Sequence, residues 1–285
     1  MLKIGNDLVF QGWLDISGKT IISVKIEKSN EDILIDNKKY IRFGSIIIEE
    51  LEDNTKPIII TEGKTDWKHL KKALERFQDD RFYTDLDIQF LEYEDMNMGD
   101  AELDRMVQTY SKIEQTKKYI FMFDRDNNTY VKKYAKEEFN NHGNNVYSFC
   151  IPKISDELDE ICIEFYYKEK DLTTKDENGK QIFIGKDFLS NGNSKCGKYI
   201  TEKRHAKPLD ILDRDKKVYL KEDNEWSSNI ALSKNNFTNN VINDVTGFDD
   251  FDIEYFKLVF DVVEKIHNKY EEWTAKLSLT TVVIF

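Results

Sequence analysis

The sequence contains no long apolar run, few cysteines and no phosphate-binding loop of the Gly-x-x-x-x-Gly-Lys-Ser/Thr kind. A membrane-spanning helix needs about 18 or more consecutive apolar residues. The first residues, Met1 to Gly5, lead directly into polar ones, where a secretory signal would continue with an apolar segment. These absences predict a cytoplasmic protein that does not contact a membrane. The three cysteines lack CxxC spacing, so neither a disulfide framework nor a zinc site is expected.

Basic residues are the minority among the charged ones. The chain has 42 Lys and Arg against 54 Asp and Glu, a net charge of −12. An acidic surface repels phosphate groups, so the chain has no general electrostatic attraction for a polyanion. A positive surface must be local, or must come from bound metal ions or a partner protein. The length of 285 residues and the hydrophobic content of 40% suffice for one large domain or two modest ones.

Residues 1–56 alternate apolar and polar residues and carry few helix signals. Apolar stretches such as Ile21–Ile26 and Ile46–Ile48 are separated by turn residues such as Ser17-Gly18. This pattern is typical of short strands. A polar stretch, Glu49–Lys56, precedes Pro57. We therefore predict a β-rich N-terminal segment that ends near residue 56.

Residues 57–152 alternate apolar strands with amphipathic helices. The predicted strands are Ile58–Thr61, Ile88–Tyr93, Tyr119–Phe123 and Val146–Ile151. The predicted helices are Asp66–Phe77, a helix opened by Asp100, and a short helix near Val131–Phe139. Such alternation favours right-handed crossovers, and hence an α/β fold with a mainly parallel four-stranded sheet and helices on both faces.

Residues 153–285 are less regular and are predicted to form an α+β accessory region. Asn178-Gly179 lies between the apolar segments Ile161–Tyr167 and Gln181–Ile184, which is a hairpin signal. From Phe256 to Trp273 apolar and aromatic residues recur at helical spacing. This spacing predicts a terminal amphipathic helix that packs in the core or in a dimer interface.

Acidic residues follow two of the predicted parallel strands. Glu62 comes after Ile58–Thr61, and Asp124 and Asp126 come after Tyr119–Phe123. If these strands are neighbours, the three carboxylates meet at the carboxyl edge of the sheet. Clustered carboxylates need a cation, and oxygen ligands suit Mg²⁺ or Mn²⁺, which also bind phosphate oxygens. Asp66, one helical turn from Glu62, is expected to bind a second ion or to orient a water molecule.

The segments Ile-Ile-Ile-Thr-Glu62-Gly63-Lys64-Thr-Asp66 and Phe-Met-Phe-Asp124-Arg125-Asp126 resemble the two motifs of the TOPRIM family. The resemblance covers roughly residues 57–152. TOPRIM domains occur in primases, topoisomerases, recombination proteins and nucleases, and the motif acids serve metal binding and catalysis. The resemblance therefore implies that Glu62, Asp124 and Asp126 are catalytic residues of a Mg²⁺- or Mn²⁺-dependent enzyme.

Many TOPRIM members have a third acid two residues after the Asp-x-Asp pair, where this chain has Asn128. This departure favours a nuclease similar to the OLD (overcoming lysogenization defect) enzymes over a topoisomerase. In OLD-like nucleases a further acid and a lysine from the C-terminal part join the second metal site. The resemblance makes Glu164 the candidate acid and Lys234 the candidate lysine, with Lys186 and Lys195 as competitors.

The one local basic stretch with interleaved aromatic residues predicts contact with nucleic acid. Its basic residues are Lys195, Lys198, Lys203, Arg204 and Lys207. Backbone contact and base stacking by such a stretch would suit a single strand. A solvated loop is an equally weighted alternative. Lys64, beside the first motif acid, is a further candidate for nucleic-acid binding.

Together these patterns predict an endonuclease that cleaves DNA or RNA, an effector in bacterial defence against phage. Its acidic balance suggests regulation by association, either with a separate ATPase or other regulatory protein, or as a homo-oligomer through the terminal helix. A phosphatase of the haloacid-dehalogenase type is an alternative, in which Asp124 would attack phosphorus and Asp126 would protonate the leaving group. A TOPRIM-fold binding or inhibitory module with idle acids is another.

Overall fold

The computed structural model describes residues 56–94, 98–201, 207–212, 217–222 and 229–280, with side chains to residue 268, and short strands nearer the N-terminus. The chain divides into two compact units, Met1–Thr55 and Lys56–Phe285. In the first unit the strands β1 to β4 form one antiparallel sheet and β5 pairs with β6. Their bounds are Leu2–Lys3, Val9–Phe10, Ile26–Lys28, Glu31–Ile33, Ile41–Phe43 and Ile46–Ile48. The rest of the predicted β-rich segment lies outside the described residues.

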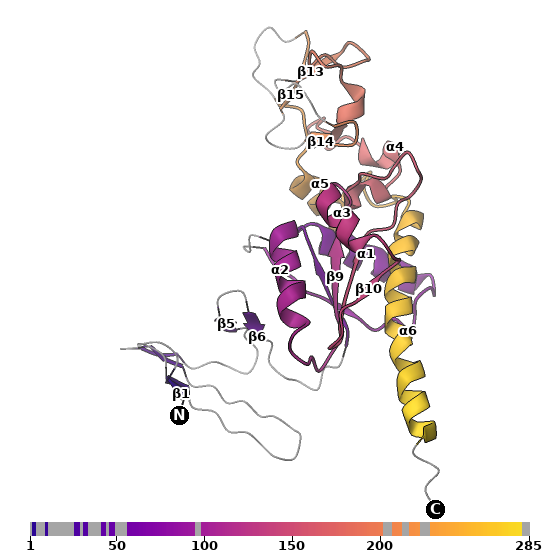
Figure 1. Ribbon diagram of the computed structural model, residues 1–285. Coiled ribbons are helices and arrows are strands. Elements are labelled where there is room, and N and C mark those ends of the chain that lie inside the picture. The colour runs from indigo at the N-terminus through magenta and orange to yellow at the C-terminus, as the bar shows by residue number, and fades with distance from the viewer. Residues whose placement is uncertain are drawn as a thin grey trace, which may run out of the picture. The chain divides into compact units, whose positions relative to one another are not determined.

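The second unit is built on a five-stranded, mostly parallel sheet of strand order β10-β11-β9-β7-β8 (Figure 1). The strands are β7 (Ile58–Thr61), β8 (Gln89–Phe90), β9 (Tyr119–Phe123), β10 (Asn140–Asn141) and β11 (Val146–Cys150). Four of them are parallel, as expected, and β7 and β9 are neighbours. The expected strand number was wrong by one, because the polar edge strand β10 pairs antiparallel with β11 and carries no apolar signal.

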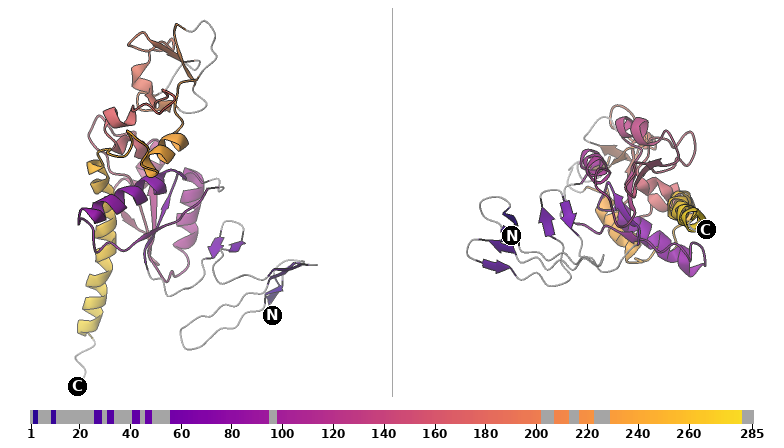
Figure 2. Two further views of the ribbon diagram at one scale, coloured as in Figure 1. Left: turned by 180° about the vertical axis from the view of Figure 1, so that it is seen from behind. Right: turned by 60° about the horizontal axis from the view of Figure 1, so that its bottom comes forward.

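Helices cover both faces of this sheet, as the alternating side chains of the buried strands require. On one face, Ile59, Ile120 and Phe149 share a core with α1 (Asp66–Asp79) and α6 (Lys257–Thr280). On the other face, Phe121 contacts Tyr110 of α2 (Asp100–Tyr110), and Phe123 stacks on Tyr134 of α3 (Asn128–Tyr134). Figure 2 shows α2 and α6 on opposite sides of the strands.

The segment after β11 joins the same hydrophobic core. Ile163, Tyr166, Phe237 and Phe260 belong to one cluster with the residues of the sheet. Its elements are η1 (Ile163–Tyr166), α4 (Glu169–Leu172), β12 (Phe183–Ile184), η2 (Gly185–Asp187), β13 (Tyr199–Thr201), β14 (Ile211–Leu212), β15 (Val218–Leu220), α5 (Lys234–Ile242) and η3 (Glu254–Phe256). The terminal helix α6 is present as predicted, and its apolar residues from Val259 to Ile266 face the core.

The predicted hairpin around Asn178-Gly179 does not form. Ile163–Tyr166 is a 3-10 helix, and Phe183–Ile184 pairs with Ile211–Leu212 instead. Gly179 does lie in a tight turn, because Lys180 N–H donates to the carboxylate of Asp176 at 2.8 Å. The turn signal was therefore correct and the pairing of its flanks was wrong. In the described part of the chain, no helix is both long and apolar enough to cross a membrane.

Candidate metal centre

Glu62 and Asp124 lie side by side at the carboxyl ends of two adjacent parallel strands. Thr61, the last residue of β7, is in register with Met122 of β9. The residues that follow each strand therefore meet at one edge of the sheet. Here the backbone N–H of Asp124 donates to Oε2 of Glu62 at 3.2 Å. The predicted juxtaposition of the two motif acids is confirmed.

Gly63 allows Asp66 to approach the turn after β7. The N–H of Gly63 donates to Oδ2 of Asp66 at 2.6 Å, and Thr65 Oγ1 lies 3.4 Å from Oδ1. A Cβ atom on Gly63 would lie only 2.5 Å from Oδ1 and 2.8 Å from Oδ2 of Asp66. The glycine is thus required for the position of a buried carboxylate. The hydroxyl of Tyr93 donates to the carbonyls of Thr61 and Glu62, which holds the same turn from the other side.

Asp100 joins the acidic cluster, although the sequence suggested only that it opens a helix. Gly99 occupies the N-cap position of α2, with φ of 148°, and Asp100 is the first helical residue. One oxygen of the Asp100 carboxylate accepts from Nδ2 of Asn127 at 2.7 Å. Asp100 does not follow an apolar strand directly, so the strand-end pattern missed it. Its position at the start of the helix between β8 and β9 was the only sequence signal for it.

The cluster is short of positive charge. Burial, followed by the neighbouring acids Asp100, Asp126 and Asp66, raises the pKa of Glu62 to about 9. Burial, and then Asp66 and Glu62, raise the pKa of Asp124 well above its usual value. Asp124 is 7% exposed, and its Oδ1 has no hydrogen-bond partner among the described residues. A cation at this edge would stabilise the ionised acids.

Glu164 and Lys234 enter the site from the C-terminal part of the chain. The Lys234 Nζ lies 3.0 Å from Oε2 of Glu164, which is fully buried in η1. Burial alone would raise the pKa of Glu164, but the positive charge of Lys234 opposes it and the pKa lies below its usual value. Lys234 is the first residue of α5, whose N-terminus is capped by Ser233 Oγ accepting from the N–H of Asn236 at 3.1 Å. The structure thus brings both candidates together.

A buried histidine connects α1 to α5 behind this ion pair. His69 Nδ1 lies 2.9 Å from the Tyr167 hydroxyl, and Nε2 lies 2.9 Å from Thr238 Oγ1. The single hydroxyl proton of Thr238 is donated to the carbonyl of Lys234 at 2.8 Å. Nε2 of His69 must therefore carry the proton that Thr238 accepts, and Nδ1 accepts from Tyr167. Burial lowers the pKa of His69 to about 4, which keeps the ring neutral.

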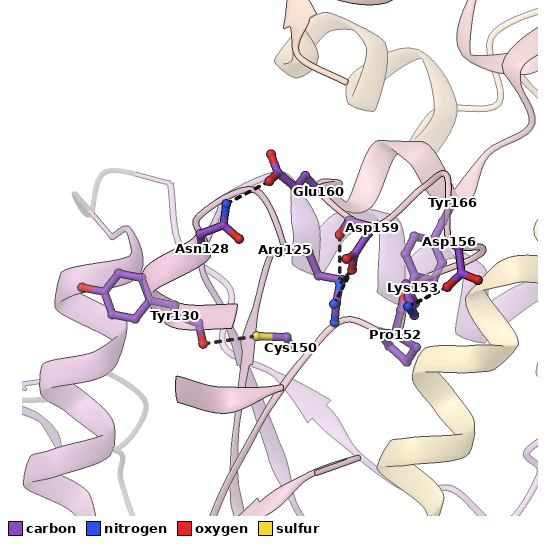
Figure 3. Close-up of polar contacts among 10 residues, drawn as sticks. All are labelled: Arg125, Asn128, Tyr130, Cys150, Pro152, Lys153, Asp156, Asp159, Glu160 and Tyr166. Atoms are coloured by element: carbon purple, nitrogen blue, oxygen red, sulfur yellow. Dashed lines mark hydrogen bonds and ion pairs between the residues drawn. The ribbon is translucent and has the colours of Figure 1, made fainter. Parts of the chain in front are cut away.

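Arg125, between the two motif aspartates in the sequence, contacts Asp159 and holds the segment that leads to Glu164 (Figure 3). Its backbone N–H donates to the carbonyl of Ile161 at 2.9 Å, and its Nε donates to the carbonyl of Asp159 at 2.9 Å. Asn128 Nδ2 donates to Oε1 of Glu160 at 2.8 Å. The Asp-x-Asp loop and the 159–161 segment therefore form one connected unit.

The other predicted lysines are distributed differently. Lys207 donates to the carbonyl of Asp126 at 3.2 Å, and Lys186 pairs with Glu169. Both lysines line a cavity beside Asp126. Lys186 is not part of the Glu164–Lys234 ion pair. Lys64, Lys195 and Lys198 are exposed, and Lys203 and Arg204 lie outside the described residues. Lys234, not Lys186 or Lys195, is therefore the lysine that the fold places among the acids.

The donor set suits a hard divalent cation. Carboxylate oxygens of Glu62, Asp66, Asp124 and Asp126 are the ligands that Mg²⁺ and Mn²⁺ prefer. No three His, Cys, Asp or Glu side chains in the described residues are arranged to hold an ion as they stand. Glu62 and Asp66 instead accept from backbone N–H groups. Oδ1 of Asp124, which has no hydrogen-bond partner among the described residues, fits a cation, and binding would require the neighbouring acids to rearrange around it.

Comparisons of the chain with protein-family models, curated proteins and solved structures find no match.

Proposed function

We propose that the chain is a Mg²⁺- or Mn²⁺-dependent nuclease of the TOPRIM type, acting on DNA or RNA. The observation that carries the proposal is the contact between Glu62 and the backbone of Asp124, at the carboxyl ends of β7 and β9. The buried Oδ1 of Asp124, which has no hydrogen-bond partner among the described residues, independently supports a cation at this site. A metal bound here would polarise a phosphodiester and lower the pKa of a water molecule.

The acidic residues of the site would bind the metal ion, and Lys234 would interact with the phosphate. Glu62, Asp124 and Asp126 would hold the ion next to the phosphate, with Asp66 and Asp100 behind them. Asp126 is exposed, so it is the motif acid best placed to meet a substrate from solvent. Lys234 is charged, oriented by Glu164 and adjacent to Asp124 and Asp66, whose negative charges act on it. Its ammonium group would stabilise negative charge that develops on the phosphate oxygens.

The phosphatase alternative leaves most of this arrangement without a role. It would use Asp124 and Asp126 as nucleophile and acid, yet the free oxygen of Asp124 is buried. It also assigns nothing to Glu62, to Asp66 under Gly63, or to the Glu164–Lys234 pair. The nuclease proposal uses all of them, which is why we prefer it.

The proposal extends to the biological setting. The OLD-like resemblance supports an anti-phage effector in the cytoplasm. The balance of 54 acidic against 42 basic residues supports weak substrate binding by the chain alone and regulation by association, with a separate ATPase, with another regulatory protein or with further copies of the chain.

A cleavage assay tests the function. Plasmid DNA, single-stranded DNA and total RNA are incubated with purified protein in Mg²⁺, in Mn²⁺ and in EDTA. Glu62→Gln and Asp124→Asn should each abolish metal-dependent cleavage. Asp85→Asn, an equally small change at an exposed aspartate between α1 and β8, should retain it. Hydrolysis of a simple phosphomonoester with a trapped aspartyl-phosphate would favour the phosphatase, and metal binding without turnover would favour the idle module.

A further inference from the structure

A cavity of about 610 Å³ opens directly beside the candidate metal centre. Asp126 and Lys234 line one part of it, and Pro208, Leu209 and Ile211 line another. Of the three motif acids, only Asp126 lines the cavity. The remaining walls come from segments after residue 156 that none of the motifs includes.

The size of the cavity limits what can enter. Its volume lies within the range of pockets that enclose one small organic molecule. A base paired in a duplex is stacked above and below and cannot enter such a space without leaving the helix. A nucleotide that is already unpaired can enter without that loss. The cavity therefore favours an unpaired nucleotide over a base-paired one.

The lining fits a nucleoside better than a bare phosphate. Pro208, Leu209 and Ile211 give an apolar surface on which a base can lie. Carboxylates such as Glu157 and Asp210 also line the cavity, and they repel phosphate but accept hydrogen bonds from sugar hydroxyl and base amino groups. The uncharged part of a nucleotide therefore belongs inside.

Cations mark the end of the cavity where a phosphate would lie. Lys207 Nζ donates to the carbonyl of Asp126 at 3.2 Å and lies 3.7 Å from Oε2 of Glu160. Lys234 also lines the cavity, and its charge, like that of Lys207, acts on Asp126. A phosphate placed there is adjacent to the metal-binding acids, with its nucleoside pointing toward Leu209 and Ile211.

One wall of the cavity is fixed before any ligand binds. Asp159 is held by Arg125, and Glu160 is held by Asn128, as Figure 3 shows. Arg125 offsets the charge of Asp159, and the uncharged amide of Asn128 orients Glu160 through a hydrogen bond. A fixed wall lowers the ordering cost of binding.

We propose that this cavity binds the unpaired nucleotide that adjoins the scissile phosphate, so that the substrate is single-stranded nucleic acid or an unpaired segment of a duplex. The inference rests on the proposed nuclease function and specifies its substrate. The sequence indicated some of the lining residues, such as Asp126, Lys207 and Lys234, but not the cavity that they share.

The experiment compares one labelled oligonucleotide as a single strand, as a perfect duplex, and as a duplex with an unpaired loop, in DNA and in RNA. Wild-type protein with Mn²⁺ should cleave the single strand and the loop about tenfold or more faster than the duplex. Pro208→Trp, which fills the cavity from an exposed position, should remove that preference. Leu189→Trp, at a residue that is 49% exposed and outside the cavity, is the matched control and should keep it.

Binding is measured separately by fluorescence anisotropy with Asp124→Asn protein, so that cleavage does not interfere. Adding Pro208→Trp should weaken single-strand binding about tenfold, and adding Leu189→Trp should not. If Pro208→Trp fails to fold, Lys207→Gln at a 58% exposed side chain takes its place, with weaker binding and a shallower salt dependence expected. Absence of cleavage by wild type would defeat the nuclease proposal. Equal cleavage of all three substrates would overturn the assignment of the cavity. Equal single-strand binding by the Pro208→Trp and Leu189→Trp variants would overturn it as well.

Discussion

Lys234 and Glu164 form an ion pair with 3.0 Å between Nζ and Oε2, although Glu164 is fully buried. The pair joins the start of α5 to η1, two elements 70 residues apart in the chain. Taking a carboxylate out of water is costly, and a paired lysine offsets that cost. The structure thus places a charged lysine beside the acidic cluster and keeps it there through a second carboxylate.

Lys234→Met should destabilise the protein by about 3 to 5 kcal/mol, because it leaves Glu164 as a buried charge without its partner. Adding Glu164→Gln should recover part of that loss. Urea unfolding measures both. The control is Lys170→Met, since Lys170 is 77% exposed and its contact with Asp171 is 3.6 Å, so a change within about 0.5 kcal/mol is expected. A loss in Lys234→Met no greater than in this control would contradict the buried pair.

The metal-free protein should lose stability as the pH rises. Burial and neighbouring acids raise the pKa of Glu62 from 4.5 to about 9, and burial and Glu164 raise that of Asp66 from 3.8 to about 6. Between the unfolded and folded pKa values the folded state binds more protons, so the contribution of these two acids to stability is full below about pH 4 and falls toward pH 9. Melting in EDTA should show a decrease on the order of 5 °C from pH 5.5 to 8.5, which Mg²⁺ reduces. A flat profile would show that these acids do not interact.

Asp124→Asn should reduce the rate of metal-dependent cleavage about 100-fold or more. It should also raise the melting temperature of the protein measured in EDTA. The mutation removes one of several repelling carboxylates, while the Asp124 N–H that donates to Glu62 is unchanged. Stabilisation by Mn²⁺ should disappear with the activity. Asp85→Asn provides the comparison in both measurements. A large loss of stability without metal would instead identify Asp124 as a structural residue.

The strand-end acids could be predicted from sequence because two local rules suffice for them. Apolar runs define β7 and β9, and parallel crossovers bring their carboxyl ends to one edge. Asp100 escaped this reasoning, since its position depends on how the chain crosses from β8 to α2. The apolar run around Ile163 suggested one side of a hairpin, but long-range contacts such as Arg125 to Asp159 fix the segment beside the sheet. Such contacts have no local sequence signal, and the cavity depends on them.

Gly63→Ala should reduce activity and Mn²⁺ stabilisation more than it reduces folding stability. The added Cβ would lie 2.5 Å from Oδ1 of Asp66, so that carboxylate must move. Gly143→Ala is the contrasting variant, because Gly143 has φ of 80° and open space around the new Cβ. It should cost about 1 kcal/mol through backbone strain and leave activity unchanged. Melting curves with and without Mn²⁺, beside cleavage rates, separate the two effects. Equal loss of activity in both alanine variants would refute a specific role for Gly63.

Thr238→Val should lower the cleavage rate through a shift of Lys234, although Thr238 is placed behind the site. The variant keeps the shape of the side chain, removes the bond to the Lys234 carbonyl, and leaves the Nε2–H of His69 buried without an acceptor. An unsatisfied buried donor costs about 1 to 3 kcal/mol. Thr238→Ser, which retains the hydroxyl, should restore both stability and rate.

Thr173→Val is the matched control for the loss of the hydroxyl, because Thr173, which caps the C-terminal end of α4, makes the same bond to the carbonyl four residues earlier, at 2.8 Å and in an exposed position. Its stability and activity should match wild type. If Thr238→Val is destabilised but cleaves with an unchanged rate constant and an unchanged pH profile, His69 and Thr238 serve only the core. A reduced rate constant with unchanged substrate affinity, restored by serine, identifies the pair as positioning residues for Lys234.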